Sequence, residues 1–197
     1  MKLHVLLRDK GDPTVQSRTD DELLRSLAAG SVDSMAAFFD RNHERVRTLA
    51  RRLLGDDAAA EDVVQEVFAS FSRAARRYRG DCDLQCFLLG ITVKKARSHL
   101  RSTIRRRHLL ERYAREERPG PRDPEQDTYR KELARRLVWA LDQISPAHRE
   151  AFVLCEIQGL GAGQAASVLG IPEATVRTRL FHGRARLRGL FSEEVTS

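Results

Sequence analysis

The chain has 197 residues, of which 41% are hydrophobic and 32% charged, enough for one domain or two small ones with a real core. Lysine and arginine number 35 against 28 acidic residues, so the formal net charge of +7 favours a polyanionic partner, with a merely well-solvated surface as the alternative. Three cysteines make no disulfide framework, and the short apolar run at the N-terminus, interrupted by Arg8 and Asp9, argues against a signal peptide or a membrane span. We therefore expect a cytoplasmic protein without membrane insertion.

The first hundred residues show helical spacing throughout. Residues 19–22 form a capping-box pattern and begin a short helix that ends near Gly30. A longer helix ends at Gly55, and Asp56 or Asp57 caps the next one. After a short break, a fourth helix turns basic towards its end. No stretch alternates between apolar and polar residues, so this half is predicted to be an all-α bundle.

Residues 105–128 interrupt this pattern, because they hold three prolines, many charges and few apolar side chains. Such a segment buries little surface, so we expect a flexible charged linker, helical only near Leu109–Tyr113. The predicted organisation is all-α, with two small helical domains joined by this linker. Its parts are an N-terminal extension expected to be mobile (1–18), an N-terminal helical bundle (19–104), the linker (105–128) and a C-terminal helix-turn-helix domain (129–192).

The second half begins with an apolar helix face that ends at Ile144. Ser145 and Pro146 are a cap and a first-turn proline, and they start a helix that ends at Gly159. A short helix over residues 162–169 then precedes a turn at Gly170.

The last helix follows that turn, and it carries five arginines and no acidic residue between positions 174 and 191. Two helices joined by a short glycine-containing turn are typical of a helix-turn-helix, whose second helix enters the major groove of DNA. Its N-terminal end presents Arg177 and Arg179, and an arginine can form two hydrogen bonds with guanine. The later Arg184, Arg186 and Arg188 suit phosphates or an acidic partner. A membrane-surface helix and a solvated helix face are the weaker alternatives.

Residues 160–187, LGAGQAASVLGIPEATVRTRLFHGRARL, resemble the C-terminal promoter-reading region of bacterial sigma factors of the extracytoplasmic-function (ECF) group, and residues 144–160 resemble the helix before it. In the first half, AAAEDVVQEVFASF (58–71) is similar to the family segment that grips the clamp helices of RNA polymerase. FLLGITVKKARSHLRSTIRRR (87–107) resembles the segment that melts promoter DNA. The resemblance covers nearly the whole chain beyond residue 18.

The resemblance implies a transcription initiation factor, without enzymatic activity or cofactor, that binds core RNA polymerase through its clamp helices and flap. It implies reading of the minus-ten and minus-thirty-five promoter elements, assistance in DNA melting, and control by an anti-sigma factor. The implied site residues fall into three sets. For the minus-thirty-five element they are Arg149, Thr175, Arg177, Thr178, Arg179, His182 and Arg184. For the minus-ten element and melting they are Tyr78, Arg79, Lys94, Lys95, Arg97 and Arg101. For polymerase they are Glu61, Asp62, Gln65 and Glu66.

Each set has a plainer structural alternative. The alternative for Arg149 is a surface residue at the start of its helix that contacts no DNA. The alternative for Tyr78 is a side chain that only packs against its neighbours. Glu61 and Asp62 also suit the positive end of a helix dipole. Lys94 and Ser98 stand where the family usually has an asparagine and an aspartate. A degenerate sigma paralogue, which binds polymerase but melts promoters poorly, is therefore a further alternative.

Two other functions compete with this one. A helix-turn-helix regulator acting without polymerase leaves the whole first half unexplained. An enzyme lacks support, because the sequence shows no P-loop, no paired carboxylates in an apolar setting and no nucleophile with a base. Cys82 and Cys86 have the spacing of a metal or redox pair, but no second pair stands nearby to complete a metal site.

Overall fold

The structure is a computed structural model that describes residues 22–80, 82–111 and 129–193. Every regular element within those ranges is a helix, which confirms the predicted all-α class. The predicted N-terminal extension, residues 19–21 of the capping box and residues 112–128 of the expected linker lie outside the described part of the chain.

The N-terminal half contains a helix over residues 22–29, then α2 (Val32–Leu54), α3 (Asp57–Ala75) and α4 (Leu84–Glu111). The backbone reverses between α2 and α3 at Gly55, whose φ of 73° is left-handed. A second constraint acts there, since a Cβ on Gly55 would lie 2.6 Å from a carboxylate oxygen of Asp142 in the other half. Asp56 then caps α3 by accepting a hydrogen bond from the amide of Ala59 at 2.7 Å, as the sequence predicted.

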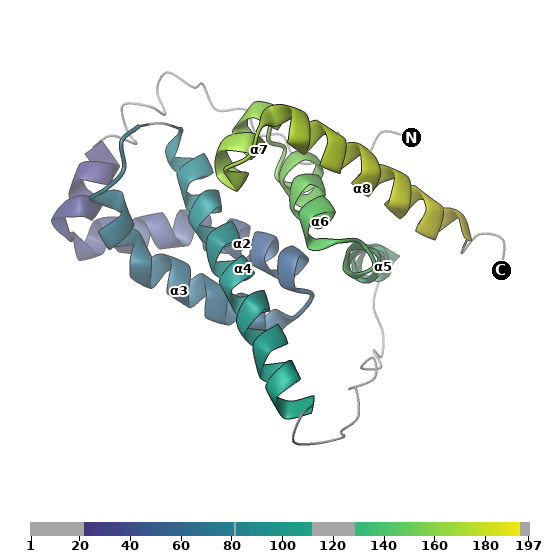
Figure 1. Cartoon of the computed structure of the whole chain (residues 1–197). Coiled ribbons are helices and arrows are strands. Elements are labelled where there is room, and N and C mark those ends of the chain that lie inside the picture. The colour runs from purple at the N-terminus through teal and green to yellow at the C-terminus, as the bar shows by residue number, and fades with distance from the viewer. Residues whose placement is uncertain (1–21, 81, 112–128, 194–197) are drawn as a thin grey trace.

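The core of this half is built from aromatic and aliphatic side chains at helical spacing. Phe38 of α2 stacks on the fully buried Phe71 of α3 with ring centroids 4.5 Å apart. Phe68 meets Phe38 edge to face at 6.2 Å. These contacts align α2 with α3, and α4 packs across both helices (Figure 1).

The C-terminal half contains α5 (Tyr129–Asp142), α6 (Pro146–Phe152), a π-helical turn η2 (Val153–Ile157), α7 (Ala162–Leu169) and α8 (Glu173–Glu193). Ser145 caps α6 by accepting a hydrogen bond from the amide of His148, with Pro146 in the first turn as predicted. The π turn was not predicted, since the sequence indicated one helix from Ser145 to Gly159. The amide of Gln158 donates to the carbonyl of Val153 at 2.9 Å and closes that turn.

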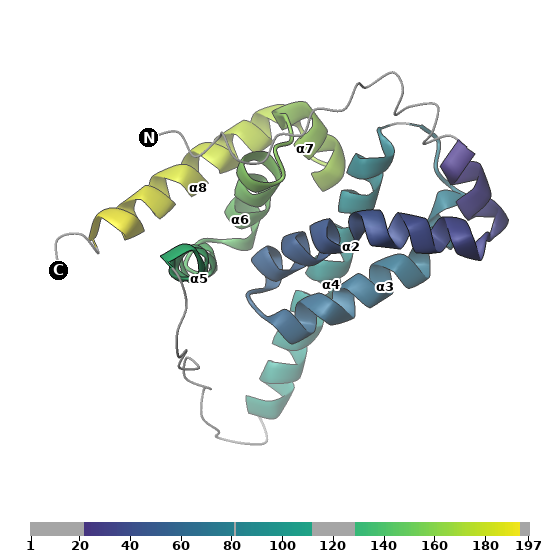
Figure 2. The same ribbon diagram turned by 180° about the vertical axis from the view of Figure 1, so that it is seen from behind.

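The two halves share one apolar core. Figures 1 and 2 show α5–α8 lying to one side of α2 and α4. Of the helices of the second half, α7 makes the most extensive contact with α4. The shared core joins Leu89 and Val93 of α4 to Leu154 and Ala165 of the second half, all buried. The sequence predicted two separate domains joined by a linker and did not predict this mutual packing.

The fourth helix is longer than expected. It runs to Glu111, so residues 105–111, which the sequence placed in the linker, continue the helix of the first half. Three of these seven residues are arginine, which is a good helix former.

Candidate nucleic-acid and polymerase interfaces

The C-terminal half contains the predicted helix-turn-helix. α7 ends at Gly170, whose φ of 66° is left-handed, and α8 begins three residues later at Glu173. Leu169 and Val176 are buried on either side of the turn and hold the two helices together. This packing turns the opposite face of α8 towards solvent, which is the face that a DNA-reading helix must present.

The side chains at the N-terminal end of α8 divide by exposure. Arg177 and Thr178 are exposed, whereas Thr175 and Arg179 are half-buried. Arg177 forms an ion pair with Glu173, one helical turn earlier, at 2.5 Å. Its side chain is 72% exposed, so water screens this pair and the guanidinium is readily released to another acceptor.

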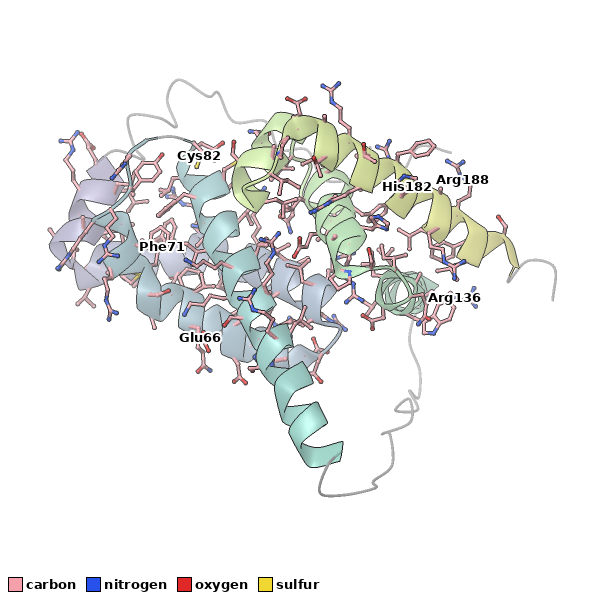
Figure 3. The ribbon with its side chains drawn as sticks, viewed as in Figure 1. Glu66, Phe71, Cys82, Arg136, His182 and Arg188 are labelled. Atoms are coloured by element: carbon pink, nitrogen blue, oxygen red, sulfur yellow. The ribbon has the colours of Figure 1, made fainter. Side chains whose placement is uncertain are left out.

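His182 and Arg184 continue this surface along α8. His182 is exposed and its ring stacks against that of His148 of α6, with centroids 5.8 Å apart. Arg184 forms an ion pair with Glu156 of η2. Figure 3 places His182 and Arg188 along α8, away from the N-terminal half, so this stretch of the helix is open to a partner.

Arg149, the remaining residue predicted for the minus-thirty-five element, is buried between the two halves. Arg149 is 8% exposed. Its guanidinium donates a hydrogen bond to the carbonyl of Leu53 at 2.9 Å and forms an ion pair with Asp142 at 2.7 Å. Burial lowers the pKa of Arg149, and Asp142 opposes that shift. The apolar contact between the two halves covers this side chain, so in this conformation Arg149 contacts no DNA.

A second basic surface lies in a groove of about 760 Å³ between α3, α4 and the end of α7. Phe87 and Ile91 supply apolar surface to its walls. Its cations come from α3, the turn after it and α4, and are Arg73, Arg77, Lys94, Arg97 and Arg101. An apolar or aromatic floor with cations beside it suits a single nucleic-acid strand, whose bases stack while its phosphates meet the arginines.

Three of those cations were predicted, and Arg73 and Arg77 were missed. Arg73 lies in the last turn of α3 and Arg77 in the turn after it, whereas α3 is acidic nearer its beginning. That change of charge along the segment was the signal available.

Tyr78 and Arg79 lie at a smaller pocket beside the groove. Its lining includes Arg77, Phe87 and Ser167 as well. The ring of Tyr78 meets Phe87 edge to face with centroids 5.0 Å apart, and its hydroxyl donates to the carbonyl of Cys82. Tyr78 therefore packs in this conformation, while Arg79 is exposed.

The cations predicted to bind the melted strand differ in whether they form ion pairs within the protein. Lys95 forms an ion pair at 3.1 Å with Glu66 of α3 and is directed to that helix. Arg97 is bound by Glu150 of α6 through two hydrogen bonds of 2.7 Å each. Lys94 and Arg101 are exposed.

Three acidic residues of α3, Glu61, Asp62 and Glu66, form one exposed face together with Gln65, which is called the acidic face. Val63, Val64 and Val67 on the opposite face are buried in the core. Arg47 of α2 reaches Glu61 at 3.4 Å, so the edge of this acidic face is partly neutralised. Figure 3 shows Glu66 on the N-terminal half, well away from His182 and Arg188 of α8.

The three cysteines carry free thiols. Burial, reinforced by Asp83, raises the pKa of Cys86 to about 12, so this thiol stays protonated at neutral pH. Within the part of the chain that the structure describes, no group of three or more metal-binding side chains comes together.

An all-helical chain with a basic groove in its first half and a helix-turn-helix in its second has the architecture of a polymerase-directing DNA-binding factor. Sequence comparison agrees, since the Sigma-70 region 2 family matches residues 38–107 and the Sigma-70, region 4 family matches residues 134–187. The chain belongs to the sigma-70 family of RNA polymerase sigma factors, in its ECF group. It is therefore a transcription initiation factor, as its sequence predicted.

Individual relatives support this membership. The chain is 32% identical to RNA polymerase sigma factor CarQ of Myxococcus xanthus, over 83% of its own length and 92% of that protein. It is 36% identical to ECF RNA polymerase sigma factor SigE of Mycolicibacterium smegmatis, over 75% of its own length and 58% of that protein.

Two solved structures share its fold. The first is CnrH in complex with the cytosolic domain of CnrY, at a TM-score of 0.66 and 25% identity over 88% of this chain and 97% of that one. The second is the sigma factor RpoE of Bartonella quintana in complex with the anti-sigma factor NepR, at a TM-score of 0.66 and 20% identity over 82% of this chain and 98% of that one. None of the helices described here is long and apolar enough to span a membrane.

Proposed function

We propose that this sigma factor divides its work among three surfaces. The acidic face of α3 binds core RNA polymerase, the groove between α3 and α4 holds the melted minus-ten strand, and the exposed face of α8 reads the minus-thirty-five element. The division into a polymerase-binding and melting domain, a linker and a promoter-reading domain (129–192) belongs to the same proposal, with the first boundary moved from residue 104 to the end of α4 at Glu111.

The observation that supports this assignment best is the chemistry of the groove. It combines Phe87 and Ile91 with cations contributed by α3 and α4. Double-stranded DNA offers phosphates but hides its base faces, so apolar walls beside arginines favour an opened strand over a duplex. A regulator that binds only duplex DNA has no use for such a groove.

The acidic face has a different role, because acidic side chains repel DNA. Asp62 and Gln65 are exposed on α3 beside Glu61 and Glu66, in a protein whose net charge is +7. A protein partner with complementary cations explains a concentrated negative surface in a DNA-binding chain. Core RNA polymerase is that partner in the proposal.

An anti-sigma factor is the proposed regulator of this chain. CnrH, which shares this fold, was solved in complex with the cytosolic domain of CnrY, and RpoE with the anti-sigma factor NepR. We assign the chain no catalytic step and no cofactor.

Capture of purified core RNA polymerase by the tagged protein, at moderate salt and after nuclease digestion, tests the proposal. Stoichiometric capture followed by promoter-dependent run-off transcription is expected. A protein that binds duplex DNA and never captures polymerase would instead be a stand-alone helix-turn-helix regulator.

A further inference from the structure

Glu173, the first residue of α8, holds its carboxylate beside the arginine that the proposed function places at the minus-thirty-five element. One carboxylate oxygen accepts a hydrogen bond of 2.5 Å from Nη2 of Arg177, one helical turn further along. The positive end of the helix dipole also favours an acidic residue at this position. The dipole explains why a carboxylate stands at the start of α8, but it does not explain why that carboxylate holds Arg177.

The other carboxylate oxygen faces α7. A Cβ on Gly163 of α7 would lie 3.4 Å from Oε2 of Glu173. Glycine is unfavourable inside a helix, yet here its missing side chain leaves the carboxylate uncrowded by α7. The side chain of Glu173 is 45% exposed against 72% for Arg177. Glu173 is therefore the more confined partner of the pair, and Arg177 is the one that projects into solvent.

The contact with Glu173 leaves Arg177 able to bind a base. A guanidinium has five N–H donors, and Glu173 accepts a hydrogen bond from Nη2 alone. Each of the two terminal nitrogens of Arg177 keeps a hydrogen for O6 or N7 of a guanine, which is the usual pairing of arginine in the major groove. One guanidinium can thus bind Glu173 and a guanine at the same time.

The strength of the pair depends on its surroundings. In the free protein water screens the pair between Glu173 and Arg177, so it contributes little to stability. Against the edges of the base pairs water is displaced, and the same pair becomes stronger because the effective dielectric constant falls. An arginine that is already oriented also loses less side-chain entropy when it binds.

The carboxylate has opposite effects on affinity and on selectivity. Its negative charge repels the phosphates of every DNA sequence alike. Its hydrogen bond, in contrast, fixes the plane in which Arg177 meets a base, and that plane suits the two acceptors of guanine. A residue with this combination of effects serves the choice of sequence rather than the strength of binding.

We propose that Glu173 is a positioning residue for promoter reading, which orients the guanidinium of Arg177 so that it selects guanine. Glu173 acts through Arg177 and contacts no base itself. The inference rests on the proposed role of Arg177 at the minus-thirty-five element.

The test uses the full chain in complex with core RNA polymerase. The complex is mixed with a library of DNA duplexes that carry a randomised segment long enough for both promoter elements, and the bound duplexes are sequenced. The measured quantity is the ratio of guanine to the other bases at each position of the recovered motif. The Arg177→Ala variant identifies the guanine that Arg177 reads, because the preference for that guanine is lost.

The decisive variant is Glu173→Gln, which keeps the size of the side chain and removes its charge. The matched control is Glu156→Gln, which removes the same charge and also frees an arginine of α8, in this case Arg184. Circular dichroism checks that all variants keep the helical content of the wild type.

Glu173→Gln is expected to lower the preference for the guanine read by Arg177 roughly fivefold or more. The preferences at other positions and the total amount of bound DNA should not fall, because one repulsive charge has been removed. Glu156→Gln should change the preference for that guanine less than about twofold. In the Arg177→Ala background, Glu173→Gln should change no base preference further, since the two residues act as one unit.

Three results would overturn the role of Glu173. They are an unchanged guanine preference in Glu173→Gln, an equal loss in Glu156→Gln, which would reflect charge alone, and a further change of base preference in the double variant, which would mean that Glu173 contacts a base itself.

Failure of the proposed function gives a different pattern. If no variant captured core polymerase, or if Arg177→Ala lost no guanine preference, the proposed function would be contradicted together with this inference. Normal capture and a guanine preference that depends on Arg177 but not on Glu173 would remove only the role of Glu173.

Discussion

At the scale of single residues, exposure separates the arginines that are ready to bind DNA from those that are not. Arg177 is 72% exposed and held only by a screened pair with Glu173, whereas Arg149 is 8% exposed and hydrogen-bonded across the two halves. Releasing Arg177 costs little, while Arg149 is released only when the halves separate. Arg177 is therefore the residue at which promoter reading is best tested.

Replacing Arg177 with alanine should reduce transcription from a minus-thirty-five-containing promoter roughly 5- to 150-fold, the range expected for one lost two-bond base contact. Run-off transcription with purified polymerase measures this. Arg188→Ala, on the same helix but nearer its end, should reduce transcription less. Capture of core polymerase should be unchanged in both variants, and its loss in Arg177→Ala would contradict the assignment of this residue to DNA.

At the scale of elements, the turn between α7 and α8 requires a glycine, whereas the interior of α8 does not. Gly170 has a φ of 66°, a conformation that strains residues with a Cβ. Gly189, within α8, has no atom within 4 Å of an added Cβ and no positive φ. The same substitution should thus have opposite effects at the two positions.

Gly170→Ala should destabilise the protein by about 1–2 kcal/mol through this strain. Gly189→Ala should stabilise it by about 0.5–1 kcal/mol, because alanine loses less backbone entropy in a helix. Thermal denaturation followed by circular dichroism compares both variants with the wild type. Equal destabilisation by the two alanines would show that the left-handed turn is not the cause.

At the scale of the whole molecule, charge is segregated in a way that the net value of +7 conceals. The acidic face of α3 lies on the N-terminal half, well away from α8 (Figure 3). Opposite charges placed on separate surfaces allow one chain to bind a protein and a nucleic acid together.

Asp62→Lys should therefore weaken capture of core polymerase by about tenfold or more, because it reverses a charge within the proposed contact. Binding of duplex DNA by the isolated protein should not decrease. Asp40→Lys makes the same charge change at an exposed position on α2 and should leave capture nearly unchanged. If both variants captured polymerase like the wild type, the acidic face would be a solvated helix flank.

Local chemistry along the chain was enough to predict most helices. Asp56, Ser145 and Gly170 act at helix ends as their residue types indicate, because caps depend on neighbours three or four positions away. The helical spacing of apolar residues likewise predicted an all-α bundle, whose core contains the buried Phe71. The helix-turn-helix and the acidic face followed from the same short-range patterns.

Only the tertiary structure decided how the halves meet. The pair between Arg97 and Glu150 joins positions 53 residues apart, and Arg149 reaches Leu53 over 96 residues. Helical periodicity reports which face of a helix is apolar, but it does not say which other face will cover it. A sequence pattern therefore identifies Arg97 and Arg149 as cations suited to DNA, and only the packing of two apolar surfaces shows that both are occupied within the protein itself.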